Sequence, residues 1–290
     1  MDNARVTAAL LVPLAPLVLA GCAAPPHRDE PPARIVHIAD VAALVLPLDA
    51  YRPTPAQRRS VQRAEKTLVM ACLRRFGLAA DIADPAPPPF AQNARRYGLA
   101  DEVRAKKLGY STPEISKRPP RPELPQQVRQ VAWGDGPATV RGRRVPAEGC
   151  VGEADRRLNA GVQPGGTLAD RLAFASLEAS EQDTRVRAAF ARWSTCMKRA
   201  GHSYATPMDA NRDRRFRDAR KHDADQLETE TAVADVRCKH QSRLIDVWAG
   251  AEAAYQERAI ARHRPELDRE RKALDARLRN ATKALIRTDK

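Results

Sequence analysis

The stretch AVADVRCKHQSRLIDVWAGAEAAYQERA, residues 232–259, repeats with the period of an α-helix and decides the fold class. Residues on one face follow each other in alternating steps of four and three: Leu227, Thr231, Ala234, Cys238, Gln241, Ile245, Trp248, Glu252, Tyr255 and Ala259. Apolar neighbours widen this face, so we expect a helix that is buried on more than one side. The signal runs over residues 223–286, and Pro265 interrupts it. After Pro265 the chain either packs back as a hairpin or extends the first helix beyond a kink.

The composition also favours helices. Aromatic residues make up 4% of the chain, so its cores must be built largely from Ala, Leu and Val. Cores of this kind suit closely packed helices better than sandwiches of β-strands. Prolines recur through residues 81–146 and forbid long helices there. We therefore predict an all-α, mainly helical ectodomain with an irregular, Pro-rich middle segment and a long C-terminal helical hairpin.

Shorter helices are predicted upstream from their start and stop signals. Thr54-Pro55 is a capping residue followed by a proline suited to the first turn, and Gly77 ends that helix. Ser180 and Asp183 have the spacing of a capping box for a helix that Gly201 stops. Further helices are expected over residues 99–108, 147–159 and 167–178.

Four cysteines downstream of Cys22 form a repeated pattern. CLRRFG begins at Cys72 and CMKRAG at Cys196, and a second helix-borne cysteine follows each segment, Cys150 and Cys238 respectively. Outside the cell an even number of cysteines indicates disulfides. Four cysteines allow three pairings, and local order favours Cys72–Cys150 and Cys196–Cys238. The simplest interpretation is two related helix-loop-helix units, each with one bridge.

Two other uses of the cysteines compete with the disulfides. Zinc sites place paired ligands two to four residues apart, and no two cysteines here are that close. Cys238 and His240 form the only near pair, and on a helix they point to different faces. We therefore predict no metal site. A catalytic cysteine activated by a histidine remains an alternative, although a structural disulfide is favoured for a protein outside the cell.

The N-terminus indicates where the protein resides. An apolar run over residues 6–20 leads into Leu19-Ala20-Gly21-Cys22, which fits the box cut by the bacterial lipoprotein signal peptidase. Cys22 would then carry the lipid. The run is short for a membrane span, which needs about 20 residues. The alternatives are an ordinary signal peptide cut near Ala23-Ala24 and a buried apolar helix.

This interpretation divides the chain into parts. Residues 1–21 are the signal peptide, and residues 22–34 are the lipidated Cys22 with an extended, Pro-rich tether. Residues 35–160 form the first helical unit, with irregular loops. Residues 161–290 form the second unit and the long C-terminal helices. The expected location is the extracytoplasmic face of the cell membrane.

The chain is strongly basic, with a formal net charge of +14. Outside the cell this charge excludes nucleic acid as the expected partner and favours anionic head groups, an anionic wall polymer or an envelope protein. The competing interpretation is a solvated surface, because the charges are intermixed along the sequence.

Several short segments together resemble secreted, actinobacterial-type lipoproteins of unassigned function. They cover most of the mature chain and lie at residues 46–51, 72–77, 95–99, 107–110, 149–150, 193–197, 234–239 and 247–256. The resemblance implies an envelope location and a cysteine scaffold. It implies no catalytic residue.

The sequence predicts no catalytic residue and no cofactor. Gly-x-Ser-x-Gly, His-Glu-x-x-His and Ser-x-x-Lys sets are absent from the sequence. Asp49, Asp235 and Asp246 lie beside apolar positions, but helix-surface or capping roles are favoured for them. Trp193 and Trp248 could line a ligand groove, although packing around the Cys196–Cys238 bridge is favoured.

We therefore expect a non-enzymatic lipoprotein with a binding role at the envelope. The alternative is a cell-wall-active hydrolase or its accessory subunit, which would need two placed carboxylates. A solute-binding lipoprotein is a third possibility, but the chain lacks the alternating strand and helix pattern of that architecture.

Overall fold

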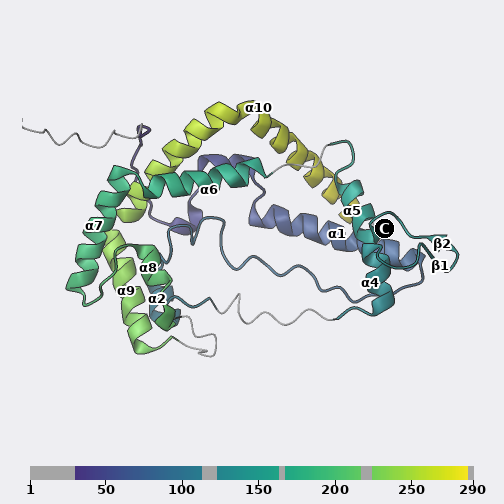
Figure 1. The fold of residues 1–290 in the computed structure, drawn as a ribbon, viewed down its shortest axis with the longest axis horizontal. Helices are drawn as coiled ribbons and strands as arrows, with labels where there is room; N and C mark the ends of the chain where they lie inside the picture. Colours follow the sequence, from purple (N-terminus) through teal and green to yellow (C-terminus); the bar gives the residue numbers. More distant parts are fainter. Residues whose placement is uncertain (1–29, 113–122, 163–166, 217–223, 287–290) are drawn as a thin grey trace, which may run out of the picture. The chain divides into compact units, whose positions relative to one another are not determined.

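The computed structural model describes residues 30–112, 123–162, 167–216 and 224–286 (Figure 1). By its contacts the chain divides into two units, Met1–Glu30 and Pro31–Lys290, and the fold described below belongs to the second. The predicted signal peptide and Cys22 lie outside the described residues. No helix in the described part of the chain is both long enough and apolar enough to span a membrane.

The fold is mainly helical, as predicted. The only strands in the described ranges are β1 (Thr139–Val140) and β2 (Arg143–Arg144), which pair antiparallel. The α-helices are α1 (Pro55–Arg75), α2 (Glu102–Leu108), α4 (Gln126–Trp133), α5 (Gly149–Leu158), α6 (Leu168–Glu181), α7 (Thr184–Arg199), α8 (Pro207–Asn211), α9 (Gln226–Gln241) and α10 (Leu244–Ile286). Short 3₁₀ turns occur at Val41–Ala43, Pro47–Tyr51 and Arg214–Phe216.

Helix α1 begins and ends where its capping signals predict. The Thr54 hydroxyl accepts a hydrogen bond from the Gln57 amide, and the Gln57 side chain accepts one from the Thr54 amide. These two bonds satisfy backbone donors that the first turn leaves without helical partners. Gly77 follows the helix with φ +63°, a conformation that costs glycine little.

The C-terminal segment corrects the prediction in two places. The long helix breaks at Ser242 and Arg243, where Arg243 adopts φ +50°, so α9 and α10 are separate helices. At Pro265 the structure has the extension rather than the hairpin. Helix α10 continues to Ile286 with non-helical angles at His263, two residues before the proline. Proline removes one backbone donor and crowds the preceding turn, which explains a kink at this point.

The start of α7 also differs from the prediction. Ser180 does not cap this helix, because it lies in the last turn of α6, where its hydroxyl donates to the Leu177 carbonyl. Asp183 is the capping residue, and its carboxylate accepts from the Arg185 amide. The two helices predicted here are both present, and only the residue that caps the second one differs. Helix α4 and the β1–β2 pair lie within the Pro-rich middle segment and were not predicted.

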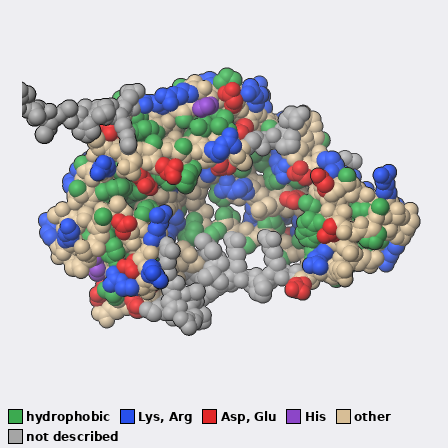
Figure 2. All heavy atoms as spheres, in the orientation of Figure 1, with side chains coloured by type: hydrophobic (Ala, Val, Ile, Leu, Met, Phe, Trp, Pro, Cys, Tyr) green, Lys and Arg blue, Asp and Glu red, His purple; other side chains and the backbone are tan. Residues whose placement is uncertain are grey.

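Two hydrophobic cores matter for the site. The first, called the tryptophan core, is centred on Trp193 of α7 and Trp248 of α10, both fully buried, and includes residues from α2 and α9. The second surrounds the Cys72–Cys150 bridge between α1 and α5 and includes apolar residues of α4. Helix α10 also packs along α1 and α6. Figure 2 shows basic and acidic side chains interspersed on the face in view, as the mixed sequence predicts.

Candidate functional site

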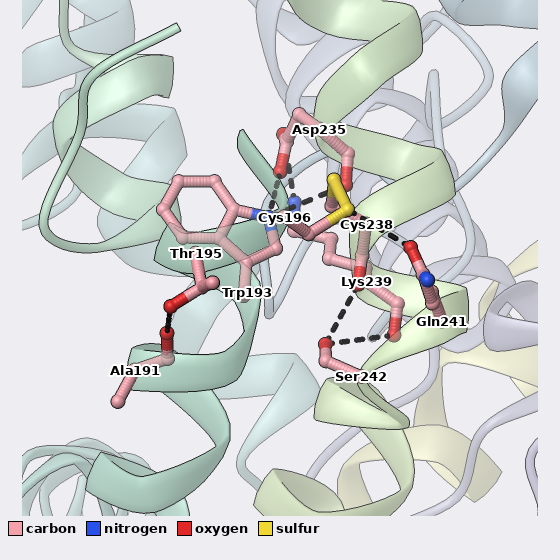
Figure 3. The surroundings of a disulfide bond; sticks show 9 residues. All are labelled: Ala191, Trp193, Thr195, Cys196, Asp235, Cys238, Lys239, Gln241 and Ser242. Carbon is pink, nitrogen blue, oxygen red and sulfur yellow. Dashed lines mark hydrogen bonds and ion pairs between the residues drawn. A yellow bond between two sulfur atoms is a disulfide. The ribbon is translucent and has the colours of Figure 1, made fainter. Parts of the chain in front are cut away.

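Both predicted disulfides form. Cys72 of α1 pairs with Cys150 of α5, and Cys196 of α7 pairs with Cys238 of α9. Figure 3 shows the second bridge beside Trp193, which lies fully buried in the tryptophan core together with Trp248. The preferred role, packing around this bridge, is confirmed for Trp193, whereas Trp248 in the same core contacts Tyr97, Phe190 and the Ser180 hydroxyl.

Helix α9 carries a buried ion pair whose two residues, Asp235 and Lys239, lie on either side of Cys238 in the sequence. Lys239 Nζ lies 2.9 Å from Asp235 Oδ2 and donates to the Leu99 carbonyl at 2.7 Å. Trp193 Nε1 donates to Asp235 Oδ1 at 3.0 Å, and the Tyr110 hydroxyl donates to Oδ2 at 3.3 Å (Figure 3 draws the first). The expected surface role of Asp235 is therefore wrong, because this side chain is completely buried.

Burial sets the protonation behaviour of this pair. It raises the pKa of Asp235 and lowers the pKa of Lys239, while their mutual attraction opposes both shifts. Every oxygen of Asp235 has a donor, so the carboxylate is held in place by partners from α2's C-terminal side, α7 and its own helix. Through the Lys239 bond to the Leu99 carbonyl, the pair also holds the last turn of α9 against the chain at Leu99.

A second buried carboxylate, Glu252 of α10, organises the neighbouring turn. Arg96 Nε donates to both of its oxygens, at 2.8 and 2.9 Å, and the Tyr97 hydroxyl donates at 2.8 Å. Gln256 lies one turn on, donates to Glu252 and accepts from the Leu48 amide. Glu252 is fully buried. Sequence reasoning placed it on the apolar face of its helix but missed its partners, which are more than 150 residues away.

The structure has a pocket of about 640 Å³ that Lys239 of the first network helps to line. Its walls come from residues 37–42, 89–104 and 239–246. This volume falls in the range of small-molecule sites, about 300–1,000 Å³. Lys239 is buried and lines the pocket, so the Asp235–Lys239 pair forms part of the pocket wall.

Basic and aromatic side chains characterise the pocket. Arg95 and Arg104 both lie over the Phe90 ring, with guanidinium carbons 5.6 and 5.0 Å from its centroid. Stacking on an aromatic face restrains a guanidinium. Arg104 also donates to the Ser111 carbonyl at 3.1 Å. Arg243 and His240 line the wall formed by the α9–α10 junction, and both are exposed.

The three carboxylates that line the pocket are already engaged. Asp40 accepts from the Ala42 amide, and Asp101 caps α2 by accepting from the Arg104 amide. Asp246 accepts from the Ile38 amide at 2.9 Å and from Arg243 Nε at 3.0 Å. Helix-surface or capping roles were predicted for Asp49 and Asp246. Asp49 does accept from the Leu46 amide, and Asp246 instead ties a distant segment to α10.

Asp246 fastens the strap, defined as residues 31–44, across the first turn of α10. Its carboxylate also lies 3.3 Å from His37 Nδ1, while that histidine side chain is 72% exposed. Gly250 lies one turn further along the helix, and a Cβ there would come within 2.7 Å of the Arg34 carbonyl oxygen. The glycine thus lets the strap approach the helix closely, and the strap forms one wall of the pocket.

The strap contact should depend on pH. Burial alone raises the pKa of Asp246, but the donors from Ile38, Arg243 and His37 outweigh it and hold this pKa below its ordinary value. A lowered folded-state pKa means that the stabilisation is complete above the ordinary value of about 3.9 and is lost as pH falls through the folded value. We expect the Ile38 amide NMR shift to titrate with a midpoint below about 3.9. Asp246→Asn should abolish this titration, and a midpoint at or above the ordinary value would contradict the contact.

No group of three or more His, Cys, Asp or Glu side chains with a metal-binding arrangement occurs among the described residues. All four downstream cysteines are in bridges, so the Cys–His nucleophile is wrong. No protein-family model, curated protein or solved structure matches the chain. The resemblance to actinobacterial-type lipoproteins therefore rests on the quoted segments.

Proposed function

We propose that the protein is a lipid-anchored, non-enzymatic lipoprotein that binds an anionic polymer of the cell envelope in the pocket described above. The observation that carries the proposal is the asymmetry of the pocket's charged groups. Its carboxylates accept backbone amides in caps and in the strap contact, whereas Arg243, which donates to Asp246 through Nε, and His240 present exposed side chains. Phosphate or carboxylate groups are the ligands that such a wall favours.

The arrangement does not favour the hydrolase alternative. Glycoside hydrolysis needs an acid and a second carboxylate that both face the substrate. Asp40, Asp101 and Asp246 instead accept backbone amides, which fix the positions of these carboxylates. Asp235 and Glu252 are fully buried and do not line the pocket.

The anchor in this proposal is Cys22. The Leu-Ala-Gly-Cys box supports it, together with the short Pro-rich stretch that separates Cys22 from the strap. Lipoprotein acylation would supply more than one chain, and one chain alone gives only marginal membrane binding.

Intact mass spectrometry of membrane-extracted protein tests the anchor. We expect a mature chain that begins at Cys22 and carries acyl chains, and we expect Cys22→Ala to abolish acylation and membrane retention. A mature protein that begins after Ala23, without lipid, would contradict the anchor while leaving the pocket proposal intact.

Titration with a glycerol-phosphate oligomer tests the pocket. We expect saturable binding by the wild-type protein that weakens as salt is added, because exposed charges are screened over about 8–10 Å at physiological ionic strength. No saturable binding of this oligomer at low salt would contradict the proposed ligand.

A further inference from the structure

The two disulfides differ sharply in access. In the Cys72–Cys150 bridge the residues are 2% and 0% exposed, so neither sulfur can be reached without opening the fold. In the other bridge Cys238 is 2% exposed, but Cys196 is partly exposed and lines a separate pocket of about 400 Å³. Thiol–disulfide exchange requires a thiolate to reach a sulfur directly. Access therefore selects one sulfur of the four.

The surroundings of Cys196 favour an anionic thiol. Arg192 and Arg199 line the same pocket, and both lie exposed on α7. No carboxylate lines it among the described residues. Positive charge beside a cysteine raises the local concentration of an approaching thiolate and stabilises thiolate charge.

Gln241 gives the opened form a ready partner. Its side-chain oxygen lies 3.1 Å from Cys196 Sγ, as Figure 3 shows. A bridged sulfur has no proton, so in the oxidised protein this is a close polar contact. A Cys196 thiol would have a proton to donate to that same oxygen.

We propose that Cys196 is a site of reversible S-thiolation by low-molecular-weight anionic thiols. The incoming thiolate attacks Cys196 Sγ, the Cys196–Cys238 bond breaks, and a mixed disulfide forms at Cys196. Cys238 leaves as a thiolate and takes a proton from water. A second thiolate can then release Cys196 and form the external disulfide, or Cys238 can displace the first thiol and restore the bridge.

The helices stay packed while the bridge is open. Trp193 and Met197 of α7 remain in the tryptophan core, and Trp193 remains bonded to Asp235 of α9. The modification therefore acts on the folded protein. This inference goes beyond the proposed function, because it needs neither the anchor nor the anionic polymer.

The experiment compares an anionic thiol, 2-sulfanylethanesulfonate, with a cationic thiol, cysteamine. The oxidised full chain is treated at low salt and quenched with acid, and peptide mass spectrometry locates adducts and free thiols. We expect adducts on Cys196, free thiol on Cys238, and an intact Cys72–Cys150 bridge. Per thiolate, we expect the anionic reagent to react about tenfold faster, with the difference shrinking at high salt.

The double variant Arg192→Gln/Arg199→Gln should bring the two rates close together. Arg187→Gln/Arg262→Gln removes two exposed charges that do not line this pocket and should leave the ratio unchanged. Circular dichroism of each variant checks that it is folded. Adducts on Cys238, earlier opening of Cys72–Cys150, or equal rates for the two thiols with the wild-type protein would overturn the inference. Failure to bind the glycerol-phosphate oligomer would leave it unaffected.

Discussion

Replacing Lys239 by alanine is expected to lower the free energy of unfolding by about 3–5 kcal/mol. The substitution leaves Asp235 fully buried without its ammonium partner and leaves the Leu99 carbonyl without its donor. Removing one member of a buried ion pair costs more than the pair contributes, because the remaining charge keeps its desolvation penalty. Chemical denaturation at neutral pH measures the loss.

Two variants control this prediction. Lys198→Ala removes an exposed lysine from the last turn of α7 and should change stability by less than about 0.5 kcal/mol. Asp235→Leu/Lys239→Met removes both charges, and we expect it to recover most of the stability lost by Lys239→Ala. A loss below about 1 kcal/mol for Lys239→Ala would show that Asp235 and Lys239 are not paired in the interior.

Removing the Cys72–Cys150 bridge is expected to cost about 4 kcal/mol. This bridge joins cysteines separated by 78 residues, whereas Cys196 and Cys238 are 42 residues apart. In the chain-entropy description the longer loop gives the larger stabilisation, by roughly 0.5 kcal/mol. Its two sulfurs also sit in a buried apolar core, so the alanine variant leaves a small cavity.

Denaturation of Cys72→Ala/Cys150→Ala beside Cys196→Ala/Cys238→Ala checks this order. The first variant should be the less stable one, and in both the remaining bridge should be intact. If the first variant matched the wild-type protein in stability, the Cys72–Cys150 bridge would have no structural role. The prediction of two stapled helical units would then lose its main support.

Local signals in the sequence determine much of this fold. The Thr54 cap, the glycines at 77 and 201 and the paired cysteine segments each act within one or two turns, so a single sequence reveals them. The break at Arg243 was not visible, because its sequence continues the helical period without Gly or Pro. The strap contact with Asp246, 208 residues from Ile38, provides tertiary partners at this junction.

The candidate site was less predictable, because its side chains also depend on partners that are distant in the sequence. Asp235 and Lys239 are four residues apart, which is the spacing of a solvated surface pair as well as of a buried one. Their burial depends on Trp193 and Tyr110, which come from other elements. The pocket itself combines three segments far apart in the chain, and no motif in any one of them indicates the others.

The most direct measurement of the central claim is calorimetric titration of the glycerol-phosphate oligomer into matched arginine variants. Arg104→Gln and Arg243→Gln each remove a charge from the pocket wall, and Arg187→Gln removes an exposed charge outside it. We predict about tenfold weaker binding for each pocket variant, as expected for loss of one charge-assisted hydrogen bond, and unchanged binding for Arg187→Gln. Equal weakening by all three variants, or by none, would contradict a binding site in this pocket.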